Sequence, residues 1–147
     1  NAGASVTDQR KVPLVTGCNP LGVFKAVRQS QYAWNIFLDE HELSSVPFRM
    51  MADMGLVSNK KVAILTDHGP HESHLAGQLW PAQAASGGYT VVHNTALPAD
   101  PQQLNALIDQ ARLTGADIVL VDAIPPRAIA LRKQMSSAGF APRFLVI

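Results

Sequence analysis

The sequence predicts an α/β fold in which helices flank a parallel β-sheet. From Lys60 onward, short continuous apolar runs alternate with segments in which apolar residues recur at helical spacing. Continuous apolar runs are typical of strands buried on both faces, as in parallel sheets, and the intervening helices supply the crossovers. Glycine and proline residues stand where the segments meet. With 147 residues, 47% of them hydrophobic, the chain can bury a core of ordinary size.

Four strands are predicted in the second half of the chain. Each is a short apolar run next to turn residues: Lys61–Thr66, Tyr89–Asn94, Asp117–Val121 and Arg143–Ile147. Three helices are expected between them. The second starts with Asp100 as its N-cap and Pro101 in the first helical position, and the third starts at Pro125-Pro126.

These three helices are expected to press an apolar stripe against the sheet. The stripes consist of Leu75, Leu79, Ala82 and Ala85 in the first helix, Leu104, Leu107, Ile108 and Ala111 in the second, and Ile129, Leu131 and Met135 in the third. Glycine, which adopts left-handed backbone geometry without strain, is expected to end each helix at Gly87-Gly88, Gly115 and Gly139.

The first half of the chain is less regular. It predicts a short strand at residues 12–15, a turn at residues 16–20 and a second strand at residues 33–38. A helix is expected from Glu42 to Leu56, because Pro47 lies close enough to its start to be tolerated. Its apolar residues are Leu43, Val46, Phe48, Met50, Met51 and Met54.

Composition argues against several classes of function. Lys and Arg total 12 and Asp and Glu total 11, so no charge surplus indicates nucleic-acid binding. The single cysteine, Cys18, supports neither an internal disulfide nor a thiolate metal cluster. The sequence contains no Gly-x-Ser-x-Gly, no phosphate-binding glycine loop with a lysine and no His-Glu-x-x-His. We therefore expect no enzyme activity and no cofactor.

The order of the segments resembles the leucine/isoleucine/valine-binding protein family. The resemblance rests on Lys60–Asp67 (KKVAILTD), Gly87–Val92 (GGYTVV), the Leu104–Gly115 helix, Ala116–Val121 (ADIVLV) and the Leu131–Phe140 segment, all in the family's order. It implies a Rossmann-like fold of the periplasmic-binding-protein type I. Residues 1–59 would be the end of the amino-terminal lobe and a crossover helix, and residues 60–147 the first four strands of the carboxy-terminal lobe. The chain would then be a fragment of a two-lobed protein.

The resemblance also implies a function. Members of this family are extracytoplasmic solute-binding components of ABC importers, which close two lobes on a small solute and deliver it to a membrane permease. The solute here would be an amino acid or an aromatic or other organic acid, and the location periplasmic or otherwise extracytoplasmic. As a fragment, the chain would expose apolar faces made for absent partners, so we expect it to self-associate.

Ligands of open α/β sheets bind beyond the carboxyl ends of the strands. The first loop there, Thr16-Gly17-Cys18-Asn19-Pro20, resembles the family's Gly-Ala-Thr-Asn-Pro turn, which grips the carboxylate of the solute. Cys18 stands near the place of the family's hydroxyl, and a thiol is the weaker donor. The alternative is a plain Asn-Pro turn with a buried cysteine.

Two further loops are expected to face the solute. After the first strand of the second lobe, His71 stands where the family has a tyrosine. Because an imidazole titrates near neutral pH, the affinity for the solute would then depend on pH. After the third strand, Asp122-Ala123-Ile124 replaces the family's Gly-Gly-Tyr, so Ile124 removes a polar contact. Both departures argue against a plain aliphatic amino acid as the solute.

Two alternatives for the same segments stay open. The spacing of His68, His71 and His74 allows a zinc site, against the simpler interpretation of a solvated cluster at the start of a helix. The run Asp117–Asp122 followed by Pro125 resembles the phospho-acceptor strand of response-regulator receivers. In that case Asp122 would be phosphorylated and Asp67 would help to hold magnesium.

Overall fold

The structure is a computed structural model that describes residues 2–16, 30–35, 40–57, 60–68, 73 and 75–146. The chain divides into two compact units, Asn1–Leu43 and Ser44–Ile147, and each is described by itself. None of the helices in the described ranges is both long and apolar enough to span a bilayer.

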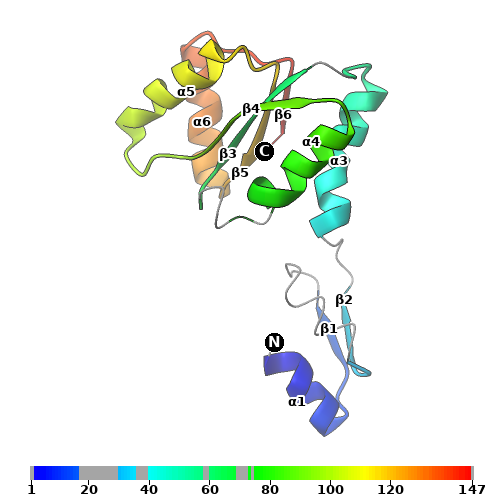
Figure 1. Cartoon of the computed structure of the whole chain (residues 1–147). Helices are drawn as coiled ribbons and strands as arrows, with labels where there is room; N and C mark the ends of the chain where they lie inside the picture. The colour runs from blue at the N-terminus through cyan, green and yellow to red at the C-terminus, as the bar shows by residue number, and fades with distance from the viewer. Residues whose placement is uncertain are drawn as a thin grey trace. The chain divides into compact units, whose positions relative to one another are not determined.

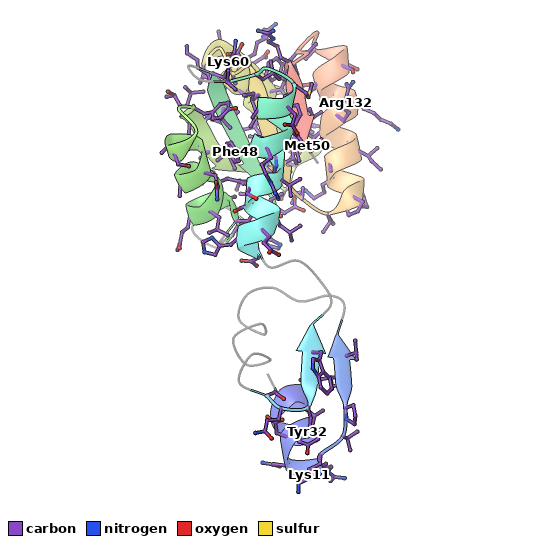
Figure 2. The ribbon with its side chains drawn as sticks, turned by 90° about the vertical axis from the view of Figure 1, so that its right-hand side faces the viewer. Lys11, Tyr32, Phe48, Met50, Lys60 and Arg132 are labelled. Atoms are coloured by element: carbon purple, nitrogen blue, oxygen red, sulfur yellow. The ribbon has the colours of Figure 1, made fainter. Side chains whose placement is uncertain are left out.

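The first unit joins a helix to a pair of short parallel strands. Helix α1 (Ala2–Arg10) is followed by β1 (Leu14–Thr16), which pairs with β2 (Ala33–Asn35). The carboxylate of Asp8 on α1 accepts hydrogen bonds from the Ser30 hydroxyl and from the backbone N–H of Gln31 and Tyr32, which ties α1 to the start of β2. Figure 2 labels Tyr32 in this unit. The sequence predicted both strands; it did not predict α1.

The second unit is built on a four-stranded parallel sheet. Its strands are β3 (Lys61–Thr66), β4 (Thr90–Ala96), β5 (Ile118–Asp122) and β6 (Phe144–Val146), in the spatial order β4-β3-β5-β6. All three pairings are parallel, and a bulge interrupts the β3–β4 register between Val62 and Ala63. The predicted α/β fold with a parallel sheet is confirmed, and each predicted strand of this half lies within one residue or two of its expected bounds.

Two helices cover one face of this sheet (Figure 1). They are α5 (Leu104–Leu113), preceded by a short 3₁₀ turn at Pro101–Gln103, and α6 (Pro125–Ser137). Side chains from Ala63, Leu65, Val119 and Val121 on the strands meet the buried stripes of both helices. The stripe predicted for α5 is confirmed: Leu104, Leu107, Ile108 and Ala111 are all buried.

The opposite face is covered by α3 (Glu40–Asp53), a π-helical turn at Leu75–Leu79 and α4 (Trp80–Ser86). Figure 2 views this face, with Phe48 and Met50 of α3 in front of the sheet. The Phe48 ring meets the Tyr89 ring edge to face at 5.5 Å between centroids. The Tyr89 hydroxyl donates to the carbonyl oxygen of Leu56 at 2.6 Å. This bond joins the segment that follows α3 to the residue that precedes β4.

Several residues predicted to be buried are exposed. Ile129 on α6 faces away from the core, and Ala128 replaces it in the α6 stripe. Of the apolar residues named in the predicted Glu42–Leu56 helix, Met50 and Met54 are exposed, whereas Phe48 and Met51 are buried. In the first predicted helix, Ala76, Leu79, Trp80 and Ala84 are buried, while Ala82 and Ala85 are exposed. The π-helical turn changes the phase of the helix before α4, so a stripe assigned at regular α-helical spacing falls on the wrong side.

The predicted helix ends are confirmed where glycine is required. Gly115 has a φ of +72° and Gly139 a φ of +67°, a left-handed backbone that strains residues with a Cβ. The predicted cap at Asp100 is present, since its Oδ1 accepts the Gln102 N–H at 2.9 Å. This bond caps the start of the 3₁₀ turn Pro101–Gln103, which precedes α5.

His93 is an ionisable group on β4, which is one of the two edge strands of the four-stranded sheet. Within the described part of the chain its buried Nε2 has no hydrogen-bond partner. Burial lowers the pKa of His93 below its ordinary value of 6.5, because the imidazolium loses hydration that no partner replaces.

This lowered pKa predicts a loss of stability in acid. The unfolded chain binds the His93 proton more readily, so the free energy of unfolding falls as pH drops below about 6.5 toward the folded-state pKa. We expect His93→Gln to reduce the decrease in Tm between pH 7.5 and 5.5, measured by circular dichroism. A His68→Gln control, at an exposed imidazole, is expected to keep the wild-type decrease. An unchanged decrease in His93→Gln would contradict this account.

Candidate functional site

The strands β3 and β5 end side by side in the middle of the sheet. Thr66 is the register partner of Asp122, and the Asp67 N–H donates to the Asp122 carbonyl oxygen at 2.9 Å. The β4 strand ends nearby, where the Leu97 N–H donates to the Thr66 carbonyl oxygen at 2.7 Å. We call the segments that follow these strands, residues 67–68, 97–99 and 122–124, the carboxyl edge.

Asp67 has an enclosed acidic side chain at the carboxyl edge, with 6% of its surface exposed. Its Oδ2 accepts the Ile124 N–H at 2.7 Å. Its Oδ1 lies 2.8 Å from Nη1 of Arg127, an ion-pair contact in which the N–H is not aligned for a hydrogen bond. Asp67 therefore joins the end of β3 to the loop after β5 and to the first turn of α6.

Arg127 binds the third loop of the carboxyl edge. Its Nη2 donates to the carbonyl oxygens of Leu97 at 3.0 Å and Pro98 at 2.6 Å. One guanidinium thus contacts the loop after β4 and, through Asp67, the loops after β3 and β5. The Arg127 side chain stays 33% exposed, whereas the side chain of its partner Asp67 is only 6% exposed.

Ser73 makes a second link across the carboxyl edge. Its hydroxyl donates to Oδ2 of Asp122 at 2.7 Å and accepts the Ala76 N–H at 3.0 Å. The second bond caps the first turn of the helical segment that leads into α4. Asp122 is therefore bound to the start of that segment.

A small cavity adjoins Arg127. It has a volume of about 180 Å³. Apart from the guanidinium, its walls are apolar, and it is lined by Leu97, Pro98, Ala99, Leu104, Arg127 and Ala130. The cavity lies between the loop after β4 and the first turns of α5 and α6, so it opens beside the carboxyl edge.

The structure brings together only part of the predicted site. Asp122 ends β5, Ala123 packs against the α5–α6 side of the core, and Ile124 is 56% exposed and held through its backbone by Asp67. Thr16 ends β1 in the first unit. The remaining predicted residues, Gly17, Cys18, Asn19 and His71, lie outside the described residues.

Sequence reasoning missed Arg127 and Ser73. Arg127 is the third residue of a helix, where a charged side chain is ordinarily solvated, and no local pattern indicates a partner 60 positions earlier. Ser73 precedes the apolar residues Leu75 and Ala76, which is a helix N-cap signal. That signal could have indicated the cap, although not the bond to Asp122.

Neither open alternative gains support from this geometry. No group of three His, Cys, Asp or Glu side chains that could hold a metal occurs among the described residues, while His71 and His74 lie outside them. In the receiver alternative, Asp67 would have to coordinate magnesium. Both of its oxygens are already engaged, by Arg127 and by the Ile124 N–H.

The chain matches a family model, but it matches no curated protein sequence. The family model described as periplasmic binding protein matches residues 1–147, which is the whole chain. A comparison with curated protein sequences gives no match.

Solved structures share the fold at low sequence identity. An ABC transporter substrate-binding protein from Desulfitobacterium hafniense in complex with Leu has a TM-score of 0.76 and 14% identity, over 99% of this chain and 42% of that protein. A solute-binding protein of an ABC transporter from Rhodopseudomonas palustris BisB5, in complex with 3,4-dihydroxy benzoic acid, has a TM-score of 0.66 and 20% identity, over 99% and 39%. The chain thus spans about two fifths of the length of these proteins.

The Asp67 contacts predict that this residue stabilises the second unit. Asp67→Ala leaves Arg127 and the Ile124 N–H without their carboxylate, and we expect it to lower the free energy of unfolding by about 1–3 kcal/mol. Asp67→Asn keeps an acceptor for the N–H and is expected to cost less.

The matched control for this prediction is Asp109→Ala. Asp109 pairs with Arg112 on the surface of α5 with both side chains about half exposed, so its loss is expected to cost less than about 0.5 kcal/mol. Urea unfolding of all three variants measures the difference. An Asp67→Ala variant as stable as Asp109→Ala would show that the network does not stabilise the fold.

Proposed function

Because the chain belongs to the periplasmic binding protein family, we propose that it acts in the solute-binding component of an ABC importer. The resemblance found in the sequence is confirmed at the level of family and fold. The protein that contains this chain would bind a small organic solute, either an amino acid or an aromatic or other organic acid. It would work in the periplasm or otherwise outside the cytoplasmic membrane.

One observation carries this proposal: three loops converge at the carboxyl edge of a parallel sheet and are tied together there. Open α/β sheets bind their ligands beyond the carboxyl ends of the strands, where the strand order reverses. The order β4-β3-β5-β6 places this reversal between β3 and β5. The solved proteins with this fold carry Leu and 3,4-dihydroxy benzoic acid, which are small carboxylates.

The arrangement of lobes is part of the proposal. We assign residues 1–59 to the end of an amino-terminal lobe with its crossover helix, and residues 60–147 to the start of a carboxy-terminal lobe. The residues proposed to line the solute site are Thr16, Gly17, Cys18, Asn19, His71, Asp122, Ala123 and Ile124. Since two lobes must enclose a solute, the chain by itself is expected to bind it weakly.

The proposed partners follow from the family. The complete protein would deliver its solute to an ABC permease and would carry out no catalytic step and bind no nucleic acid. Taken alone, the chain exposes Val15 and Trp34, which are register partners on β1 and β2. We expect such apolar surface to make the isolated chain self-associate.

Solute binding tests this proposal on the protein encoded by the complete reading frame. Thermal shift against amino acids and aromatic and aliphatic acids, followed by calorimetry, is expected to find a saturable solute. At about 100 times its Kd, a solute stabilises the protein by about 2.7 kcal/mol, which raises Tm by several degrees. No binding across the panel would argue against the proposal.

A matched pair of variants locates the site. Ile124 and Ile129 are 56% and 55% exposed, but only Ile124 belongs to the carboxyl edge. Ile124→Asp places a carboxylate next to the solute and is expected to weaken binding by about tenfold or more, which corresponds to about 1.4 kcal/mol. Ile129→Asp is expected to leave the affinity unchanged. If both substitutions changed the solute affinity equally, the carboxyl edge would not be part of the solute site.

A further inference from the structure

Building on the proposed function, we infer that Arg127 makes the carboxyl edge select solutes that carry a carboxylate and no ammonium group. Three features of this wall support the selection: the partly exposed side chain of Arg127, the enclosed carboxylate of Asp67 and the apolar side chains that line the adjoining cavity.

Arg127 is a permanent cation whose side chain is partly exposed. Arg127 keeps its positive charge at every physiological pH and presents several N–H donors in a planar fork that suits carboxylates. Contacts with Asp67, Leu97 and Pro98 hold this side chain in one position, yet 33% of it remains exposed. A donor that is already held in place loses little conformational freedom when it binds a solute.

The nearby acidic groups already have partners. An ammonium group would need a carboxylate or several carbonyl oxygens as its acceptors. Asp67 is 6% exposed, and its two oxygens serve Arg127 and the Ile124 N–H. Asp122 uses Oδ2 for the Ser73 hydroxyl. Of Asp67, Asp122 and Arg127, the guanidinium is therefore the group that can donate hydrogen bonds to a carboxylate.

The cavity indicates what the rest of the solute is like. Its walls other than Arg127 are apolar, and its volume is about 180 Å³. An apolar cavity of about 150 Å³ is large enough to hold a benzene ring. An apolar or aromatic body with a carboxylate directed at Arg127 would match both the size and the charge of this wall.

Matched solutes that differ only in the ammonium group test the inference on the complete protein. The pairs are 3-phenylpropanoate with phenylalanine and 4-methylpentanoate with leucine, and titration calorimetry measures each Kd. We expect each acid to bind at least about tenfold more tightly than its amino acid. Arg127→Gln is expected to weaken the acids about tenfold or more and to shrink the preference, because a charge-assisted contact is lost.

Two controls keep the result interpretable. Lys133→Gln removes a cation from an exposed position on the same helix and is expected to change neither affinity. A comparison of 3-phenylpropanoate with 3-phenylpropanamide on the wild type needs no variant, and the acid is expected to bind more tightly. It therefore decides the question even where Arg127→Gln does not fold.

The outcomes separate this inference from the function on which it rests. Amino acids that bind as tightly as their acids, an amide that binds like its acid, or a folded Arg127→Gln variant with wild-type affinity would overturn the selection by Arg127, while solute binding would stand. Failure of the wild type to bind any solute in these pairs or in the wider panel would contradict the proposed function itself.

Discussion

The burial of β3 and β5 on both faces is the constraint on which the rest of the second unit depends. Val62 to Thr66 and Ile118 to Val121 are buried, with alternate side chains facing α5–α6 and α3–α4. A parallel register is fixed where both faces are packed, because a slip of one residue would exchange the two faces. This register brings Thr66 and Asp122 together and so places the loops that follow them at one edge.

The same edge is held by a short chain of charged and polar contacts. Asp67 and Arg127 join three loops that are distant in sequence, and Ser73 with Asp122 joins β5 to the helical segment before α4. Buried polar groups are costly unless they are paired, and the enclosed carboxylate of Asp67 contacts both Arg127 and the Ile124 N–H. In this ion pair the Asp67 side chain is enclosed, whereas a third of the Arg127 side chain is exposed. The residues proposed to select the solute are thus also the ones expected to stabilise this edge.

The sequence was most informative where burial is continuous. The strand Lys61–Thr66 and the stripe Leu104, Leu107, Ile108 and Ala111 were predicted residue by residue, since packing on a sheet imposes a plain periodicity. Ile129 was assigned to the core wrongly, because a large apolar residue one position from Ala128 satisfies the same spacing. Arg127 was missed because its role depends on a tertiary contact with Asp67. The residues taken from the family resemblance at Gly17, Cys18, Asn19 and His71 stay predictions.

In the proposed function, the carboxyl edge forms one wall of a solute site. A crystal structure of the complete protein with its solute bound would test this arrangement. We expect the solute to lie against Ile124 and Arg127, with its carboxylate within hydrogen-bond distance of the guanidinium. A solute bound at the opposite end of the strands, or enclosed by residues that do not include the loops after β3 and β5, would contradict it.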